Sequence, residues 1–182
     1  MRAFLLVGVA LVWLLAGCSG GAVAGGADDL PGPVPEGVTF APPPSEAPPA
    51  PDFTAELLDG TPVTASDLWA ERPVVLVFTA SWCETCAEQH REAAEVVAEH
   101  DGAVALLGLV PHDDGEDARG YARELGLGHP VAVAEDEIWR NYAAMEPPLV
   151  AVVARGGRVV RGWPGGVERD VLAATLDDLV ER

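Results

Sequence analysis

The chain has 182 residues and a mass of 19.0 kDa, which suits one ordinary domain with short extensions and excludes a multidomain assembly. Its 29 acidic and 11 basic residues give a formal net charge of −18, so no basic surface for nucleic acid is expected. All the basic residues are arginine, which excludes enzymes that need a lysine for a pyridoxal Schiff base or for a nucleotide phosphate.

Residues 1–17 have the layout of a bacterial export signal. Arg2 supplies one positive charge, and an apolar run of 13 residues follows from Ala3 to Leu15. This run is shorter than the ~20 residues that a helix needs to cross a bilayer, which favours a signal peptide over a transmembrane helix. Leu-Ala-Gly-Cys at 15–18 resembles the lipobox of bacterial lipoproteins, which implies lipid attachment at Cys18. The alternative is an ordinary secretory signal that is removed together with Cys18.

Residues 18–51 are rich in Gly, Ala, Pro and acidic side chains. Their few large apolar residues are Leu30, Val34, Val38 and Phe40. A segment of this composition buries too little apolar surface to fold alone, and its prolines favour extended backbone. We therefore expect a disordered or semi-stiff linker that separates a domain at 52–182 from the outer face of the cell membrane.

Residues 52–182 alternate between strand and helix patterns. Two short strands at 53–58 and 62–64 flank a Gly turn and predict a hairpin. The run at 73–79 is β-branched and aromatic throughout, which is typical of a strand buried on both faces. A helix is predicted from Cys83 to His100, because this segment contains no Pro or Gly. The later predicted elements are strand 103–110, helix 116–125, strand 131–134, helix 135–143, strands 149–154 and 158–163 as a hairpin, and helix 167–180. The fold class is α/β, with a central mixed sheet flanked by helices.

Two cysteines, Cys83 and Cys86, lie three residues apart at the junction between the buried strand and the helix. The N-terminus of a helix favours the thiolate form of a cysteine beside it, so Cys83 is the expected nucleophile. Cys86 lies one turn further along, where it can close a disulfide onto Cys83 and act as the resolving thiol. Trp82 precedes the nucleophile and is expected to line the surface on which substrate cysteines dock.

The order of buried strand, Trp82-Cys83-x-x-Cys86, helix and a later Pro148 ahead of a buried strand resembles the thioredoxin superfamily. Within it, the chain is most similar to the TlpA-like and DsbE-like extracytoplasmic thiol-disulfide oxidoreductases. The resemblance covers about residues 52–182. It implies a thioredoxin-like fold, catalysis through a mixed disulfide, and no dissociable cofactor. It also implies a cis-proline facing the cysteine pair, at Pro148 or, failing that, at Pro147, where the substrate groove would form.

The resemblance also implies partners. These are protein thiols and disulfides as substrates, with apocytochromes c among the candidate clients, and a membrane electron-transfer protein of the DsbD or CcdA type as the redox partner. A lipid-anchored monomer at the cell envelope would fit this role.

The sequence departs from the family pattern at several positions. Thioredoxin carries a buried aspartate six residues before its first cysteine, whereas this chain has Val77 there. TlpA-like reductases often have a Glu three residues after the second cysteine, where this chain has Gln89, with Glu88 one residue earlier. Glu88 is therefore a candidate acid or base. Pro147 has no backbone N–H to donate to a bound substrate strand.

The direction of electron flow stays open at this point. Glu84 lies between the cysteines, and its negative charge should raise the pKa of the Cys83 thiol and favour a reducing disulfide. Glu84 is also a second candidate acid or base. Some TlpA-like reductases carry Glu at this position, which points to a reductase. Actinobacterial DsbE-type relatives share the spacing of Trp139-x-x-Tyr142 to the cis-proline, and they are extracellular oxidants.

Three other classes of protein are alternatives to a thiol-disulfide oxidoreductase. A zinc site needs four ligands, and only His90 is near the cysteines in the sequence. Copper delivery of the Sco type pairs two cysteines with a distant histidine, for which His112 or His129 could serve, but Sco cysteines are usually separated by three residues. A redox-inactive thioredoxin-fold interaction module is the third alternative. We expect no metal site, and we expect the four histidines, including His100, to be solvated surface residues.

Overall fold

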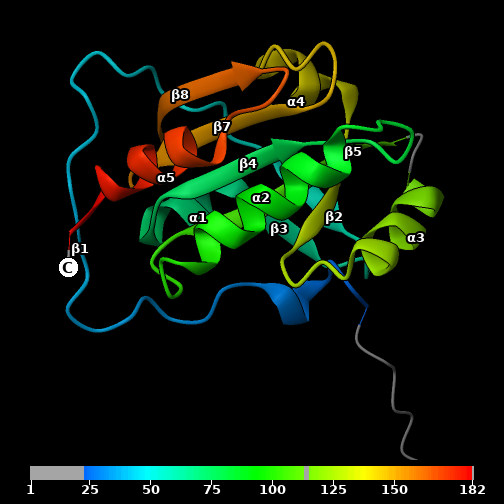
Figure 1. The fold of residues 1–182 in the computed structure, drawn as a ribbon, viewed down its shortest axis with the longest axis horizontal. Helices are drawn as coiled ribbons and strands as arrows, with labels where there is room; N and C mark the ends of the chain where they lie inside the picture. The colour runs from blue at the N-terminus through cyan, green and yellow to red at the C-terminus, as the bar shows by residue number, and fades with distance from the viewer. Residues whose placement is uncertain (1–22, 113–114, 182) are drawn as a thin grey trace, which may run out of the picture.

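The computed structural model describes residues 23–112 and 115–181, so the expected signal peptide and Cys18 lie outside the described residues. Helices and strands alternate along the domain as predicted, with one further helix, α1 (Ala65–Glu71), that is not predicted (Figure 1). The helices are Ala27–Asp29 (one 3-10 turn), α1 Ala65–Glu71, α2 Cys86–Ala98, α3 Gly115–Leu125, α4 Asp136–Asn141 and α5 Arg169–Asp177. The strands are β1 Thr39–Phe40, β2 Thr54–Leu57, β3 Pro62–Thr64, β4 Val74–Phe78, β5 Ala105–Pro111, β6 Val131–Ala134, β7 Leu149–Ala154, β8 Arg158–Pro164 and β9 Val180–Glu181.

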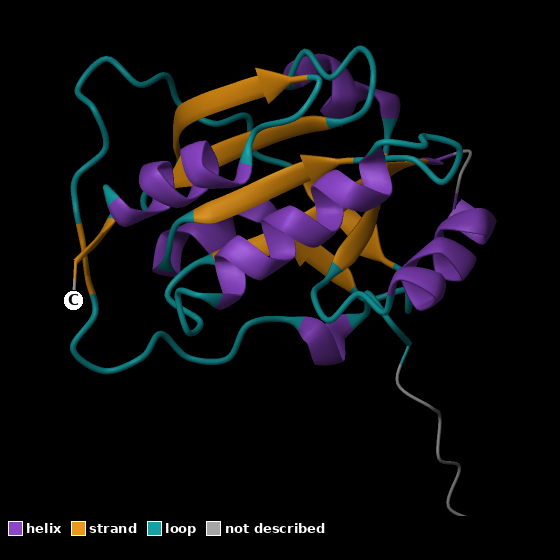
Figure 2. Ribbon diagram, in the orientation of Figure 1, coloured by secondary structure: helices purple, strands orange, loops and turns teal. Residues whose placement is uncertain are grey.

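A mixed sheet with the strand order β3-β2-β6-β5-β4-β7-β8 forms the centre of the described domain (Figure 2). Strand β4 pairs in parallel with β5 and antiparallel with β7, and β5 pairs in parallel with β6. The remaining pairs, including the β7–β8 hairpin, are antiparallel. The predicted α/β class with a central mixed sheet is confirmed.

Alternate residues of β4 point to opposite faces of the sheet, and each face has its own core. Val75 and Val77 pack in the core beneath α2 and α5. Val74, Leu76 and Phe78 pack in the other core, with Trp69 of α1 and Ile138 of α4. A smaller apolar cluster packs α3 against β5 and β6. Because β4 is covered on both faces, its carboxyl end is held firmly where the next turn begins.

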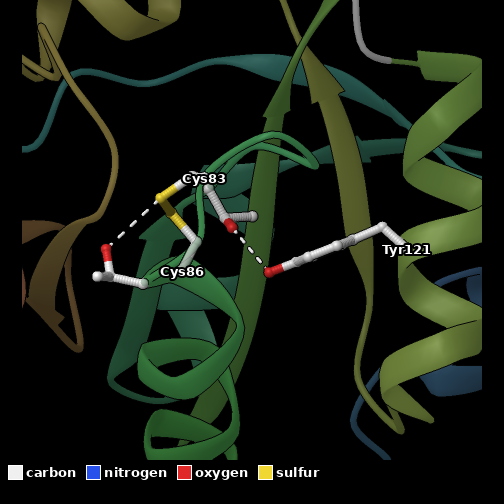
Figure 3. The surroundings of a disulfide bond; sticks show 5 residues. Cys83, Cys86 and Tyr121 are labelled. Atoms are coloured by element: carbon white, nitrogen blue, oxygen red, sulfur yellow. Dashed lines mark hydrogen bonds between the residues drawn. A yellow bond between two sulfur atoms is a disulfide. The ribbon is translucent and has the colours of Figure 1, made fainter.

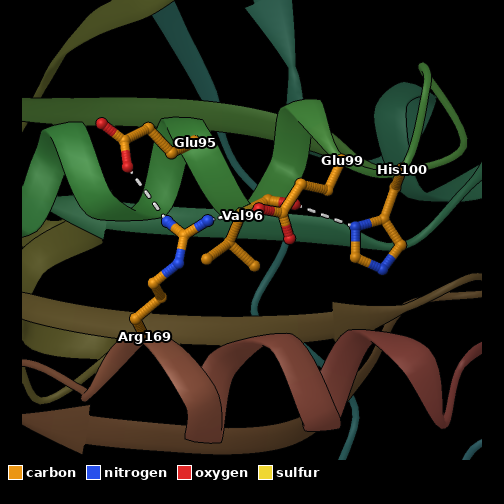
Figure 4. Close-up of polar contacts among 5 residues, drawn as sticks. All are labelled: Glu95, Val96, Glu99, His100 and Arg169. Atoms are coloured by element: carbon orange, nitrogen blue, oxygen red, sulfur yellow. Dashed lines mark hydrogen bonds and ion pairs between the residues drawn. The ribbon is translucent and has the colours of Figure 1, made fainter.

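Helices α2 and α5 lie side by side on the same face of the sheet and are joined by polar contacts (Figure 4). The guanidinium of Arg169 on α5 binds the carboxylates of Glu95, at 3.0 Å, and of Glu99, both on α2. At the end of α2, the His100 ring nitrogen Nδ1 is bonded to the Val96 carbonyl at 2.9 Å.

Helix α2 begins at Cys86, three residues later than the sequence predicts. Residues 81–85 form turns instead, in which Cys83 N–H donates to the Ala80 carbonyl at 3.1 Å and Cys86 N–H donates to the Cys83 carbonyl at 3.2 Å. The predicted helices at 135–143 and 167–180 are also shorter, at Asp136–Asn141 and Arg169–Asp177. Apolar periodicity marks the covered face of a helix and not its ends, which depend on local turn geometry.

Residues 23–51, called the N-terminal strap below, differ from the disordered linker expected for 18–51. Thr39 and Phe40 pair with β9, and Val131 N–H donates to the Gly25 carbonyl at 2.9 Å. Figure 1 shows the strap running around one side of the domain before it enters β2. Partly buried strap side chains pack on all three apolar clusters: Ala24, Ala27, Leu30, Val38, Phe40 and Ala50. These side chains are partly buried against apolar surface of the domain, so the strap is ordered without a core of its own.

No helix among the residues that the structure describes is both long enough and apolar enough to cross a membrane.

Candidate active site

The candidate site lies in the turn that follows β4. Thr79 and Ala80 continue from the strand and are completely buried, and Thr79 N–H donates to the Leu109 carbonyl on β5 at 2.9 Å. The chain then turns outward through Ser81 and Trp82 to the first cysteine. The carboxyl end of the buried central strand therefore fixes where the turn with the cysteines begins.

Cys83 and Cys86 form a disulfide, with their Cα atoms 5.3 Å apart (Figure 3). The Cys83 side chain is half-buried, whereas Cys86 is 0% exposed. The Thr85 hydroxyl lies 3.8 Å from the Cys83 sulfur. The structure brings the two predicted cysteines together, with Cys83 partly open to solvent and Cys86 closed to it.

The peptide bond between Pro147 and Pro148 is cis, in agreement with the choice of Pro148 as the cis-proline. The Pro148 carbonyl accepts a hydrogen bond from Gly165 N–H at 2.8 Å. A Cβ atom at Gly166 would overlap the Gln89 side chain and lie 3.6 Å from Pro148 Cγ. The segment before β7 is thus connected, through Gly165 and Gly166, to the first turns of α2.

Two large apolar side chains are open to solvent. One directly precedes Cys83, and the other lies shortly before β7. Trp82 is 68% exposed and Met145 is 82% exposed. Met145 lines a hollow of about 560 Å³ together with Ala143, Glu146, Pro147, Leu149, Pro164 and Gly165. No residue pattern in the sequence marks Met145 as an exposed apolar side chain.

The two candidate acids lie on the surface. Glu84 is exposed in the turn between the cysteines, and Glu88 is exposed on the first turn of α2. Val77 is 0% exposed and is flanked by Gly108 and Val150 on the neighbouring strands, so this position offers no carboxylate. Gln89 is buried and binds the Val167 backbone through both ends of its amide.

The expectation that His90, His100 and His129 are solvated is wrong, because they are only 0%, 4% and 7% exposed. The Nε2 atoms of His90 and His129 are hydrogen-bonded at 2.7 Å. Burial lowers the pKa of His90 well below its usual range, with a further contribution from His129, and burial lowers the pKa of His129 to about 4. The sequence does contain a signal for the burial of His90. This residue lies four residues after Cys86 and three before Ala93, which is the helical spacing of one buried face.

Tyr121 connects this histidine pair to the turn that carries the cysteines. Its ring stacks on His90, with ring centroids 6.3 Å apart, and its hydroxyl is hydrogen-bonded to Thr79 Oγ1 at 3.1 Å. Figure 3 shows Tyr121 reaching from α3 toward the residues around the disulfide.

His112, the other histidine considered as a copper ligand, is far more exposed, with 63% of its side chain accessible and Glu135 at 3.8 Å. In the described parts of the chain, no three His, Cys, Asp or Glu side chains are grouped as a metal site. His129 is engaged with His90 instead.

Comparison with known proteins identifies the family. The Redoxin family model matches residues 45–170. The thiol:disulfide interchange protein HelX of Rhodobacter capsulatus is 25% identical over 121 residues, which are 65% of this chain and 67% of HelX. The thiol:disulfide interchange protein DsbE of Escherichia coli K12 is 32% identical over 88 residues, 47% of this chain and 45% of DsbE. The match thus spans less than half of E. coli DsbE.

Solved structures agree with this result. DsbF of Mycobacterium tuberculosis, seen in mixed oxidised and reduced forms, superposes with a TM-score of 0.62 at 25% identity, covering 69% of this chain and 92% of DsbF. The exposed lipoprotein thioredoxin of Streptococcus pneumoniae gives a TM-score of 0.61 at 27% identity, covering 71% of this chain and all of that one. The relatives do not favour the copper-binding or redox-inactive alternatives. The chain belongs to the Redoxin family, and its thioredoxin-like fold with the Cys83–Cys86 pair is that of a thiol-disulfide oxidoreductase.

Proposed function

We propose that this oxidoreductase exchanges disulfides with cysteines of other proteins outside the cytoplasm. The observation that carries the proposal is the unequal exposure of its two cysteines. The half-buried Cys83 can meet a client, whereas the fully buried Cys86 can meet only Cys83. This arrangement separates the attacking thiol from the resolving thiol.

In the reducing direction, the Cys83 thiolate attacks a client disulfide, forms a mixed disulfide and releases one client thiolate. Cys86 then loses its proton and attacks the Cys83 sulfur. The Cys83–Cys86 bond forms, the bond to the client breaks, and the second client thiolate takes up a proton. Two electrons pass from the enzyme dithiol to the client, and the oxidising direction runs through the same steps in reverse.

The surface around Cys83 would bind the client. Trp82 and Met145 expose apolar area, and Pro147 lines the hollow beside Met145. Pro148 would shape the groove next to the cysteine pair. Because Pro147 has no N–H group, we expect the client to be held more by apolar contacts here than by pairing with the backbone.

The N-terminal sequence supports a site of action outside the cytoplasm. We propose that residues 1–17 direct export and that Cys18 carries a lipid anchor at the outer face of the cell membrane. The name of the pneumococcal relative, an exposed lipoprotein thioredoxin, supports this assignment. A membrane electron-transfer protein of the DsbD or CcdA type would recharge the enzyme if it acts as a reductase.

The test uses the chain from residue 18 onward with Cys18→Ser, so that Cys83 and Cys86 are its only thiols. A model peptide with one disulfide serves as the client. We expect exchange in this protein, no exchange with Cys83→Ser, and an accumulated peptide adduct on Cys83 with Cys86→Ser. Exchange at the original rate in both variants would overturn the proposal.

A further inference from the structure

The imidazoles of His90 and His129 form a buried pair beside the redox turn. His90 lies on α2, and His129 lies in the loop ahead of β6. Their Nε2 atoms are 2.7 Å apart, and the His90 ring lies against Gly108 of β5, where a Cβ atom would approach it to 2.9 Å. A glycine at that point leaves room for the ring within the core.

His90 lies one helical turn after Cys86, and both side chains are 0% exposed. Side chains four residues apart share one face of a helix, and helical side chains lean toward the N-terminus. The His90 imidazole therefore leans toward the turn that carries Cys86. The strand position that could have supplied a buried carboxylate holds Val77.

The hydrogen bonds of His90 favour one tautomer. Its Nδ1 atom is buried and has no hydrogen-bond partner among the residues that the structure describes, whereas Nε2 is bonded to His129. A buried N–H without an acceptor is rarer in proteins than a buried acceptor without a donor. The favoured tautomer thus has the proton on Nε2, donated to His129, and a free lone pair on Nδ1.

The surroundings of His90 keep its imidazole neutral before it accepts a proton from Cys86. Among the described residues, the titratable groups in contact with the His90 ring are His129 from the loop before β6 and Tyr121 from α3, and Cys86 lies one turn earlier on the same helix. Burial, and secondarily His129, lowers the pKa of His90 well below its usual range, so the ring is neutral at pH 7. A thiolate forming at Cys86 would stabilise the imidazolium, because opposite charges attract strongly in a low dielectric.

His129 provides a route from this core to water. It is 7% exposed and lines a surface hollow of about 450 Å³, together with Arg91, Glu95 and Leu127 among others. A proton accepted at His90 Nδ1 can be balanced by transfer of the Nε2 proton to His129 and then to solvent in the hollow.

We propose that His90 is the proton acceptor for Cys86 when Cys86 resolves the mixed disulfide, and that His129 relays the proton to solvent. This inference rests on the proposed exchange reaction. The S–H bond of Cys86 breaks, its proton passes to His90 Nδ1, and the electron pair stays on sulfur. The Cys86 thiolate then forms the bond to Cys83 Sγ and displaces the client thiolate. In the reverse direction, His90 returns a proton to the departing Cys86 thiolate.

The test follows the reduced chain from residue 18 onward with Cys18→Ser as it reacts with dithionitrobenzoic acid, in a stopped-flow spectrophotometer. Attack by Cys83 releases a first thionitrobenzoate, and resolution by Cys86 releases the second. With His90→Gln, we expect the second phase to slow about 100-fold near pH 7, which is the usual contribution of a positioned base, and the first phase to stay within about twofold. The slowed phase should also rise steadily with pH. His129→Gln should slow the second phase less, and the exposed control His112→Gln should change neither phase.

A second phase in His90→Gln within about threefold of the parent rate at every pH would overturn the inference. If that variant does not fold, nitrogen-15 NMR of the parent protein in its reduced form decides the matter. Protonated Nδ1 on neutral His90 would overturn it, and bare Nδ1 would support it. Loss of the first phase in the parent would instead contradict the proposed function.

Discussion

The side-chain amide of Gln89 is hydrogen-bonded to the backbone of Val167 at both ends. Gln89 Nε2 donates to the Val167 carbonyl at 3.2 Å, and Val167 N–H donates to Gln89 Oε1 at 2.6 Å. Both residues are buried, and neighbouring Gly166 lies next to Pro148. Gln89 therefore holds the loop after β8, and with it the surroundings of the cis-proline, against the first turns of α2.

Gln89→Leu should leave two buried backbone groups of Val167 unsatisfied and lower the free energy of unfolding by about 2–4 kcal/mol. Urea denaturation measures this change. The matched control is Glu88→Gln, an exposed neighbour on the same turn, which should change stability by less than about 0.5 kcal/mol. Equal stability of the two variants would show that the amide does not brace the loop.

Buried His129 should make the protein less stable in acid. The pKa of folded His129 is about 4, whereas an unfolded histidine titrates near pH 6.5, so protons bind the unfolded chain first as the pH falls. The free energy of unfolding should therefore decline as pH falls from about 6.5 to about 4, by roughly 2–3 kcal/mol from this residue.

The His129→Gln variant lacks this titrating group. When the pH falls from about 6.5 to about 4, its free energy of unfolding should decline less than that of the parent, by roughly 2–3 kcal/mol. Urea titrations across this pH range give both slopes. The exposed His112→Gln should keep the parent slope, and a parent slope in His129→Gln would show that His129 is not the group responsible.

Glu84 should tune the reduction potential of the cysteine pair. Its charge beside Cys83 disfavours the thiolate and so favours the oxidised enzyme, which makes the dithiol a better reductant. Glu84→Gln should raise the potential by about 5–20 mV, a small change because the carboxylate is exposed. Equilibration with glutathione buffers measures the potential. Glu88→Gln is the control, because Glu88 lies further from Cys83 in the sequence than Glu84 does. A potential that falls would contradict this account.

The N-terminal strap should contribute to stability. A chain that begins at residue 52 loses the pairing of Phe40 with Val180 and the apolar contacts of the strap, and should be less stable than a chain from residue 18 by about 2–4 kcal/mol. Phe40→Ala should account for about 1–2 kcal/mol of this difference, whereas Val23→Ala, at a 39% exposed strap position, should have little effect. Thermal unfolding compares all four proteins, and identical melting temperatures would show that the strap is a passive linker.

The sequence predicts the parts of this fold that depend on strong local patterns. The apolar run at 73–79 becomes β4, and the Gly156-Gly157 turn joins β7 to β8, because both signals are contained in a few consecutive residues. The cysteine pair and Pro148 are also recognisable, since their types and spacing carry the chemistry.

Long-range packing accounts for what the sequence does not predict. The strap depends on surfaces contributed by residues far along the chain, such as Val180 for Phe40. The His90–His129 pair joins residues 39 positions apart, and nothing near either one indicates the other. The later start of α2 depends on two backbone turn bonds at Ala80 and Cys83, which no residue type demands.

The most direct measurement is the redox titration of the chain from residue 18 onward with Cys18→Ser, with free thiols counted by alkylation and mass spectrometry in graded glutathione and dithiothreitol buffers. We expect one reversible two-electron transition that is absent from Cys83→Ser and from Cys86→Ser. A potential below about −250 mV assigns a reductase, and one above about −180 mV assigns an oxidant. Thiols that stay free in every buffer, with no reversible transition, would contradict the proposed exchange reaction.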